Sequence, residues 1–112
     1  MKIAFTAKGT SMYSEMDPRF GRTEYFVFYD EETKKVSNFD NSDTGKDAHG
    51  AGPKTAQRLF ELKANVLITG NGPGGNAAAV MNKTGIATYV GAGEMTVQTA
   101  YEAFKKGELT KV

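Results

Sequence analysis

The sequence predicts an α/β protein in which a mixed sheet of about five strands is covered by three helices. Three observations lead to this fold class. In the second half of the chain, short apolar segments alternate with amphipathic ones, which is typical of parallel strands joined by right-handed crossover helices. The first half holds strand-like segments and a polar turn, as in a hairpin. The thirteen glycines cluster between these segments, where loops are expected.

Three strands are expected in the first half of the chain. Residues 2–7 are apolar and partly β-branched, as suits a buried first strand. Residues 24–30 are rich in aromatic and β-branched side chains, which strongly favours a strand. A polar turn over residues 30–35 leads to the alternating residues 36–39, and the two runs together predict an antiparallel hairpin. The connection over residues 8–22 is long, and such connections in small domains often carry function.

Helices and strands are expected to alternate in the second half. Pro53 suits the first turn of a helix that runs to about residue 63, because its missing N–H costs nothing there. A short buried strand follows over residues 65–69. Residues 76–83 are mostly small and predict the next helix, and residues 85–90 predict the last strand.

The last helix has recognisable signals at both ends. Thr96 is an N-cap candidate, because its hydroxyl can accept a hydrogen bond from the first turn. Val97, Ala100 and Phe104 recur at helical spacing and predict the buried face. Gly107 is expected to stop the helix at the C′ position.

This strand order predicts where a ligand would bind. In open α/β sheets, ligands lie beyond the carboxyl ends of the parallel strands. The first strand ends at residues 8–22, the fourth at residues 70–75 and the fifth at residues 91–93. We therefore expect these three loops to meet at one edge of the sheet.

Length and composition exclude several classes of function. With 112 residues, of which 39 % are hydrophobic and 24 % charged, the chain is expected to form one soluble domain over residues 1–112. A net charge of +1 without a basic stripe gives nucleic-acid binding no support. No apolar run approaches the roughly 20 residues of a membrane span. The start of the chain reads as a strand rather than a signal peptide, so a cytoplasmic protein is expected.

The single histidine, His49, lies in a glycine-rich loop, and the chain has no cysteine. Thiolate ligation and thiol redox chemistry are therefore excluded, and His49 is the one imidazole that could bind a metal or move a proton. Gly50 and Gly52 leave the backbone open to a bulky ligand. The alternative is that His49 is a polar loop residue that happens to precede a helix.

Two further segments are candidates for binding an anion. The loop over residues 70–75 could cradle one with the backbone N–H groups around Gly72 and Gly74, or its glycines could form only a tight turn. Residues 17–22 hold Arg19 and Arg22, which suit multi-point recognition of anions. The alternative there is that Phe20 belongs to the core and that Arg19 tethers the loop to Asp17 or Asp30.

Taken together, these blocks resemble the dinitrogenase iron–molybdenum cofactor biosynthesis family, which includes NifX, NifY and the C-terminal domain of NifB. The resemblance covers essentially the whole chain. The matching blocks are the opening strand, residues 17–22 and 25–30, Asn41, residues 49–52, residues 69–74, residues 85–86 and residues 107–109. It implies an α/β/α fold resembling the ribonuclease H motif, in which a five-stranded mixed sheet is the central layer.

The resemblance also implies a function. Family members with known roles are carriers or chaperones rather than catalysts, and they bind the iron–molybdenum cofactor or its iron–sulfur precursor. It implies His49 as a metal ligand, surrounded by other groups that face the anionic cluster: Arg19, Arg22, Gly50, Gly52, Gly72 and Gly74. Cofactor-assembly proteins are the implied protein partners, and a monomer or weak homo-oligomer is expected.

Two other functions remain open from the sequence. The same loops could become ordered on a protein partner, in an interaction or regulatory module that holds no cofactor. Alternatively, the chain could be an enzyme that acts on a phosphorylated ligand with His49 as acid and base, although no nucleophile or metal constellation accompanies that histidine.

Overall fold

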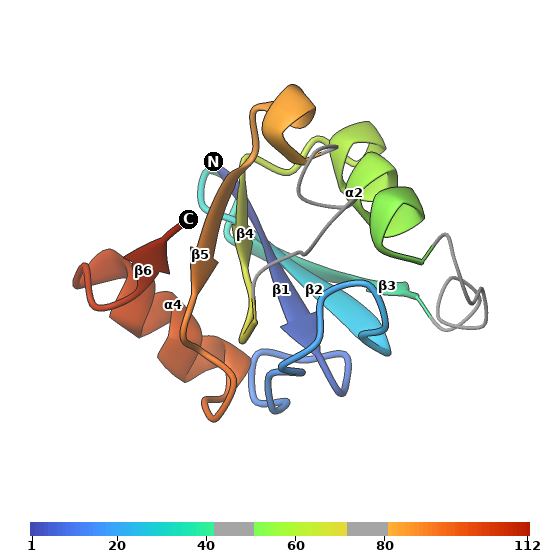
Figure 1. Ribbon diagram of the computed structural model, residues 1–112. Helices are drawn as coiled ribbons and strands as arrows, with labels where there is room; N and C mark the ends of the chain where they lie inside the picture. The colour runs from blue at the N-terminus through green and yellow to red at the C-terminus, as the bar shows by residue number, and fades with distance from the viewer. Residues whose placement is uncertain (42–50, 72–80) are drawn as a thin grey trace.

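The computed structural model describes residues 1–41, 51–71 and 81–112. Its strands form one mixed sheet with the order β3-β2-β1-β4-β5-β6 (Figure 1). The strands are β1 (Lys2–Ala7), β2 (Tyr25–Asp30), β3 (Lys35–Asp40), β4 (Val66–Ile68), β5 (Ala87–Val90) and β6 (Thr110–Lys111). The helices are α2 (Ala51–Glu61) and α4 (Val97–Lys105), and residues 81–84 are also helical.

The apolar strand β1 lies at the centre of the sheet and is paired along both edges. It pairs antiparallel with β2, where Phe5 lies opposite Val27, and parallel with β4, where Phe5 lies opposite Ile68. β4 in turn pairs parallel with β5. The carboxyl ends of β1, β4 and β5 therefore point to the same end of the sheet, as their arrowheads show (Figure 1).

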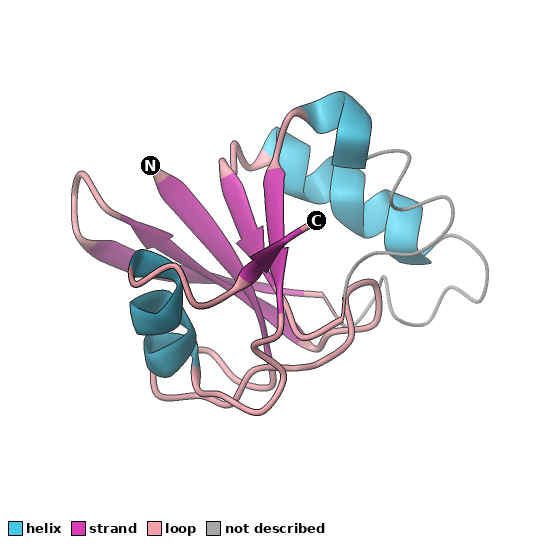
Figure 2. Ribbon diagram, turned by 60° about the vertical axis from the view of Figure 1, so that its left-hand side comes forward, coloured by secondary structure: helices cyan, strands magenta, loops and turns pink. Residues whose placement is uncertain are grey.

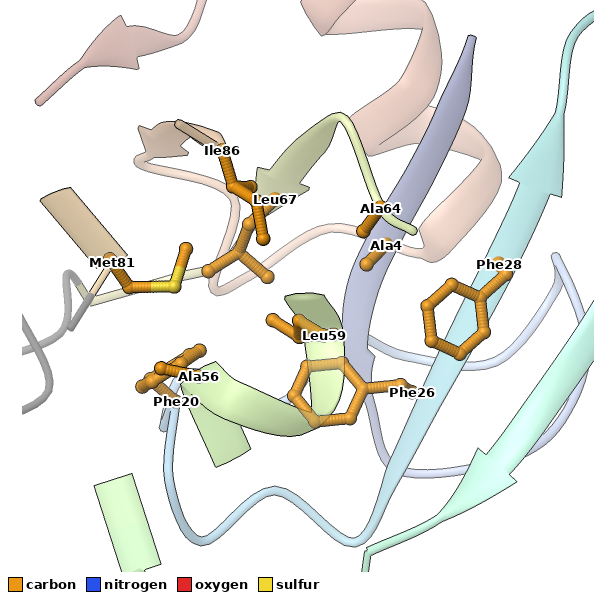
Figure 3. Close-up of a cluster of buried hydrophobic side chains, with 10 residues drawn as sticks. All are labelled: Ala4, Phe20, Phe26, Phe28, Ala56, Leu59, Ala64, Leu67, Met81 and Ile86. Carbon is orange, nitrogen blue, oxygen red and sulfur yellow. The ribbon is translucent and has the colours of Figure 1, made fainter. Parts of the chain in front are cut away.

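Two apolar layers hold the helices on opposite faces of the sheet (Figure 2). Successive side chains of a strand point to opposite faces, so Ala4 packs in one layer with Leu59 of α2. The neighbouring Ile3 packs in the other layer with Val97 of α4. Figure 3 shows the α2 layer, in which Phe26 also lies beside Leu59. The predicted α/β/α class is thereby confirmed.

The ends of α4 form as the sequence predicts. Thr96 is the N-cap, and its hydroxyl accepts the backbone N–H of Thr99 at 3.1 Å. At the other end, Gly107 has a φ of +75°, its N–H donates to the Phe104 carbonyl, and the N–H of Glu108 donates to the Ala103 carbonyl. These two bonds are those of a Schellman cap, which ends a helix with a left-handed residue.

Replacement of Gly107 by alanine should destabilise the fold by about 1 kcal/mol, because an L side chain is disfavoured in the left-handed region. A Cβ at this position would have no heavy atom within 4 Å, so the cost is conformational rather than steric. Thermal unfolding of Gly107→Ala measures it. Gly107→Asn is the matched control, since asparagine tolerates this φ, and it should keep most of the stability. Equal losses in both variants would contradict the explanation.

The long connection between β1 and β2 is bonded to the start of α4. The N–H of Val97 donates to the Ser14 carbonyl at 2.9 Å, and that of Gln98 donates to the Met12 carbonyl at 2.7 Å. The N–H of Met16 donates to the Met95 carbonyl at 2.9 Å. The first N–H groups of a helix lack partners within it, and here this loop supplies them.

The sheet has one strand more than the five predicted. β6 pairs antiparallel with β5 through Lys111 and Tyr89. With two residues, β6 is too short to show the alternation that identifies a strand in sequence. Helix α2 begins at Ala51, so Pro53 lies in its first turn as predicted. Of the helix predicted over residues 76–83, the structure describes the part from residue 81.

Candidate functional site

The loops that follow β1, β4 and β5 meet at one edge of the sheet, as predicted. We call their described residues, 17–19, 70–71 and 91–93, the three-loop rim. The N–H of Asn71 donates to the Pro18 carbonyl at 2.8 Å, and the N–H of Gly91 donates to the Gly70 carbonyl at 3.1 Å. The rim is therefore joined by backbone hydrogen bonds between loops far apart in sequence.

Gly70 occupies the tightest position of the rim. A Cβ built on it would lie 2.6 Å from the Cα of Pro18 and 2.8 Å from the Cα of Gly93. Both neighbours are backbone atoms, so neither can move away by a side-chain rotation. The three backbones thus touch, which requires glycine at residue 70. Close packing of three backbones therefore explains Gly70, the first residue of the predicted glycine loop.

Asp17 is a buried residue of the loop between β1 and β2 (residues 8–24), which we call the first loop. Its side chain has no exposed surface, and its backbone N–H donates to the Thr6 carbonyl at 2.9 Å. The hydroxyl of Thr6 donates in return to the Asp17 carbonyl at 2.7 Å and lies 3.0 Å from the hydroxyl of Thr69. Residue 17 is therefore fixed to Thr6 of β1, which also contacts the residue that follows β4.

The carboxylate of Asp17 holds Arg19 in a defined place. It accepts the backbone N–H of Arg19 at 3.0 Å, the Nε–H at 3.0 Å and an Nη2–H at 2.9 Å. Arg19 is 53 % exposed, so its guanidinium is fixed on one side and open to solvent on the other. Of the two predicted tethers, the structure contains the one to Asp17; Asp30 instead caps the β2–β3 turn, accepting the N–H of Glu32.

The two charges of this pair stabilise each other. Burial by itself raises the pKa of Asp17, but the hydrogen bonds and positive charge of Arg19 outweigh it, so that the pKa lies below its usual value. The hydrogen bond and charge of Asp17 raise the pKa of Arg19. Both groups are therefore ionised at neutral pH. Two of the five N–H donors of the guanidinium bind Asp17, which leaves up to three to offer to an anion.

The remaining residues of the 17–22 segment have different environments. Phe20 is 5 % exposed and packs edge to face against Phe26, with ring centroids 6.4 Å apart. The core interpretation of Phe20 is therefore confirmed. Arg22 is exposed. The carbonyl of Gly21, between them, accepts hydrogen bonds from Asn41 Nδ2 and from the Thr55 hydroxyl, both at 3.3 Å.

Several predicted site residues lie outside the described part of the chain: His49, Gly50, Gly72 and Gly74. Gly52 was predicted to belong to the glycine-rich loop, but it lies in the first turn of α2. A contact between His49 and the rim stays a prediction. Within residues 1–41, 51–71 and 81–112, no three His, Cys, Asp or Glu side chains are grouped so as to hold a metal ion.

The sequence did not predict that three polar residues would be buried near the loops. Thr6, Thr69 and Asn41 are at most 1 % exposed. Nδ2 of Asn41 donates to the Thr23 carbonyl at 3.0 Å, and its Oδ1 is buried without a hydrogen-bond partner in the described residues. The available signal was a polar residue at or just after the end of an apolar segment, as at Thr69 and Asn41, and it does not reveal the hydrogen-bond partner.

The chain is similar to a known protein family over most of its length. Residues 1–107 match the model of a family described as dinitrogenase iron-molybdenum cofactor. No curated protein matches the chain significantly. None of the described helices is both long and apolar enough to cross a lipid bilayer.

Two solved structures are similar over almost their whole length. The apo form of the orange protein from Desulfovibrio gigas is 34 % identical, with a TM-score of 0.94, and the match covers 99 % of this chain and 92 % of that one. A candidate NifB protein from Thermotoga is 35 % identical, with a TM-score of 0.84, and the match covers 98 % and 91 % of the two chains.

Proposed function

The chain belongs to the dinitrogenase iron–molybdenum cofactor family, and on that premise we propose that it is a non-catalytic carrier or chaperone of an anionic metallocofactor. The cargo we propose is the iron–molybdenum cofactor, its iron–sulfur precursor or a related anionic cluster. The proposed partners are that cluster and the proteins that assemble it. The similarity to the orange protein and to the candidate NifB protein supports a cofactor-associated role.

The observation that carries the proposal is the fixed guanidinium of Arg19 at the three-loop rim. Asp17 holds it at the carboxyl ends of the parallel strands, where open α/β sheets bind ligands. A metal–sulfur cluster that carries an organic acid is large and negative, so N–H donors and a fixed cation suit it. We propose His49 as its metal ligand and place further contacts around the cluster: Arg22, Gly50, Gly52, Gly72 and Gly74.

Binding without turnover fits the chemistry of the rim. The carboxylate of Asp17 and the guanidinium of Arg19 are each held in the charged form by the other. Neither group is therefore suited to transfer a proton near pH 7. The chain has no cysteine, and thiolates are the usual ligands that hold iron–sulfur clusters permanently. A site without them favours reversible loading and release, which a carrier needs.

Arg19→Gln should weaken binding of the isolated iron–molybdenum cofactor about tenfold, because it removes a charge-assisted contact but keeps a polar side chain. The measurement is anaerobic gel filtration of the protein mixed with that cofactor, with molybdenum and iron determined in the protein peak. Arg58→Gln is the matched control, since Arg58 lies over the Phe39 ring, outside the rim. His49→Ala tests the proposed metal ligand in the same assay.

Each result of this assay has a definite meaning. Stoichiometric metal on the wild type and the Arg58 variant, with less on the Arg19 and His49 variants, supports the carrier. Loss of metal from the Arg19 variant alone supports the rim and contradicts the histidine ligand. No metal on any of the four proteins contradicts a carrier of this cofactor and favours an interaction module.

A further inference from the structure

A hollow of about 420 Å³ lies on the α4 side of the sheet, beside the β2–β3 hairpin. Its volume falls within the roughly 300–1,000 Å³ typical of pockets for small ligands. The residues that shape it come from the first loop, the hairpin and α4: Met12, Tyr13, Tyr29, Val36, Gln98 and Tyr101. They are separate from the residues of the three-loop rim.

Tyrosine rings from three separate segments line this hollow. Tyr29 of β2 and Tyr101 of α4 meet edge to face, with ring centroids 5.0 Å apart and an interplanar angle of 66°. Tyr13 of the first loop is 85 % exposed, and Val36 of β3 is 45 % exposed. Two fixed rings therefore form its inner wall, and two exposed apolar side chains border its opening.

Tyr101 is held in place by a carboxylate. Its hydroxyl donates to Oε2 of Glu31 at 2.7 Å, and Nζ of Lys105 binds the same oxygen at 3.0 Å. The hydrogen bond to Glu31 raises the pKa of Tyr101 to about 12, so this hydroxyl stays protonated at neutral pH. A phenol that donates to a carboxylate gains electron density in its ring, which strengthens the attraction of the ring face for a cation.

The polar groups around the hollow also favour a positive ligand. Nε2 of Gln98 donates to Oε1 of Glu102 at 3.2 Å, which leaves the amide oxygen of Gln98 as an acceptor. Every lining side chain is uncharged. Two of the lining side chains bind carboxylates, Gln98 that of Glu102 and Tyr101 that of Glu31, and Lys105 also binds Glu31.

We propose that this hollow binds a small organic ammonium cation, such as an N-methylated amine, against the faces of its tyrosine rings. Electron-rich aromatic faces are the usual receptors for quaternary ammonium groups. The charge preference is opposite to that of the rim, where Arg19 suits an anion. This second site is therefore independent of the proposed cargo.

Choline and its neutral isostere 3,3-dimethylbutan-1-ol provide the test. The wild-type protein is labelled with ¹³C in its tyrosine rings and titrated with each compound by NMR. Choline should bind at least fivefold more tightly than the alcohol and shift the ring signals of Tyr13, Tyr29 and Tyr101. Tyr25 and Tyr89 serve as internal controls, because neither lines the hollow, and their signals should stay in place.

Substitutions at the opening show whether the ring faces carry the affinity. Tyr13→Ala should weaken choline binding about fivefold, whereas Tyr13→Phe should keep most of it, since the ring remains. Phe60→Ala is the matched control, as Phe60 is also exposed, at 57 %, and lies on α2. Equal affinity for choline and the alcohol, no shift of the three tyrosines, or unchanged binding in Tyr13→Ala would each overturn the proposal.

Discussion

Gly70→Ala should lower the free energy of unfolding by about 3 kcal/mol. This value lies at the upper end of the cost of adding an atom to a packed interior. The added Cβ would lie 2.6 Å from Pro18 Cα and 2.8 Å from Gly93 Cα, and backbone atoms cannot rotate away. The first loop and the loop after β5 would both have to move. Urea denaturation followed by circular dichroism measures the loss.

Gly93→Ala is the matched control for this prediction. A Cβ there would lie 3.3 Å from Pro18 Cβ and 3.4 Å from Gly70 Cα, so small shifts can relieve the contact. We expect a loss of about 1 kcal/mol or less. If the two variants were equally stable, the close approach of the three backbones would not be the reason for glycine at residue 70.

Asp17→Ala should destabilise the protein by about 2 kcal/mol, because it removes a buried acceptor of three hydrogen bonds from Arg19. The loss is smaller than for a fully buried ion pair, since Arg19 is half exposed and can regain water. The proposed binding of the cofactor should weaken as well, because the guanidinium would no longer be held. Glu15→Gln, an exposed acid of the same loop, should change stability by less than about 0.5 kcal/mol.

The pH dependence of this effect has a definite sign. The pKa of Asp17 is lowered in the folded protein, so its contribution is complete above the unfolded-state pKa of about 4 and is lost as the pH falls through the folded-state pKa. Asp17→Asn should therefore differ most from the wild type at pH 6 and progressively less below pH 4. Unfolding free energies at several pH values measure this. A difference independent of pH would show that the charge of Asp17 is not responsible.

The sequence was most informative where local chemistry decides the structure. Thr96 and Gly107 marked the ends of α4 because capping needs a hydroxyl at one end and a left-handed residue at the other. The hairpin between β2 and β3 followed from aromatic and alternating residues around a polar turn. β6 was missed because its formation depends on the free edge of β5 rather than on its own two residues.

The candidate site was predictable only in part. The meeting of the loops followed from the parallel strand order, but the partner of Arg19 did not, since Asp17 and Asp30 were equal candidates by sequence. Burial decides between them, because an ionised carboxylate without exposed surface needs a charged partner. The contact between the hydroxyls of Thr6 and Thr69 joins residues 63 positions apart, and no local pattern encodes such a contact. The role of His49 stays a prediction.

The bonding of the first loop to the start of α4 has a consequence for synthesis on the ribosome. The partners of Met12, Ser14 and Met16 are residues 95, 97 and 98, which emerge long after the loop itself. A nascent chain that has reached only β4 can pair β1 with β2 and can form the bonds within residues 6–17, but it lacks the bonds of this loop to the start of α4. Contacts this distant in sequence form late in folding. The rim includes residues 91–93, so it is completed only when almost the whole chain has been translated.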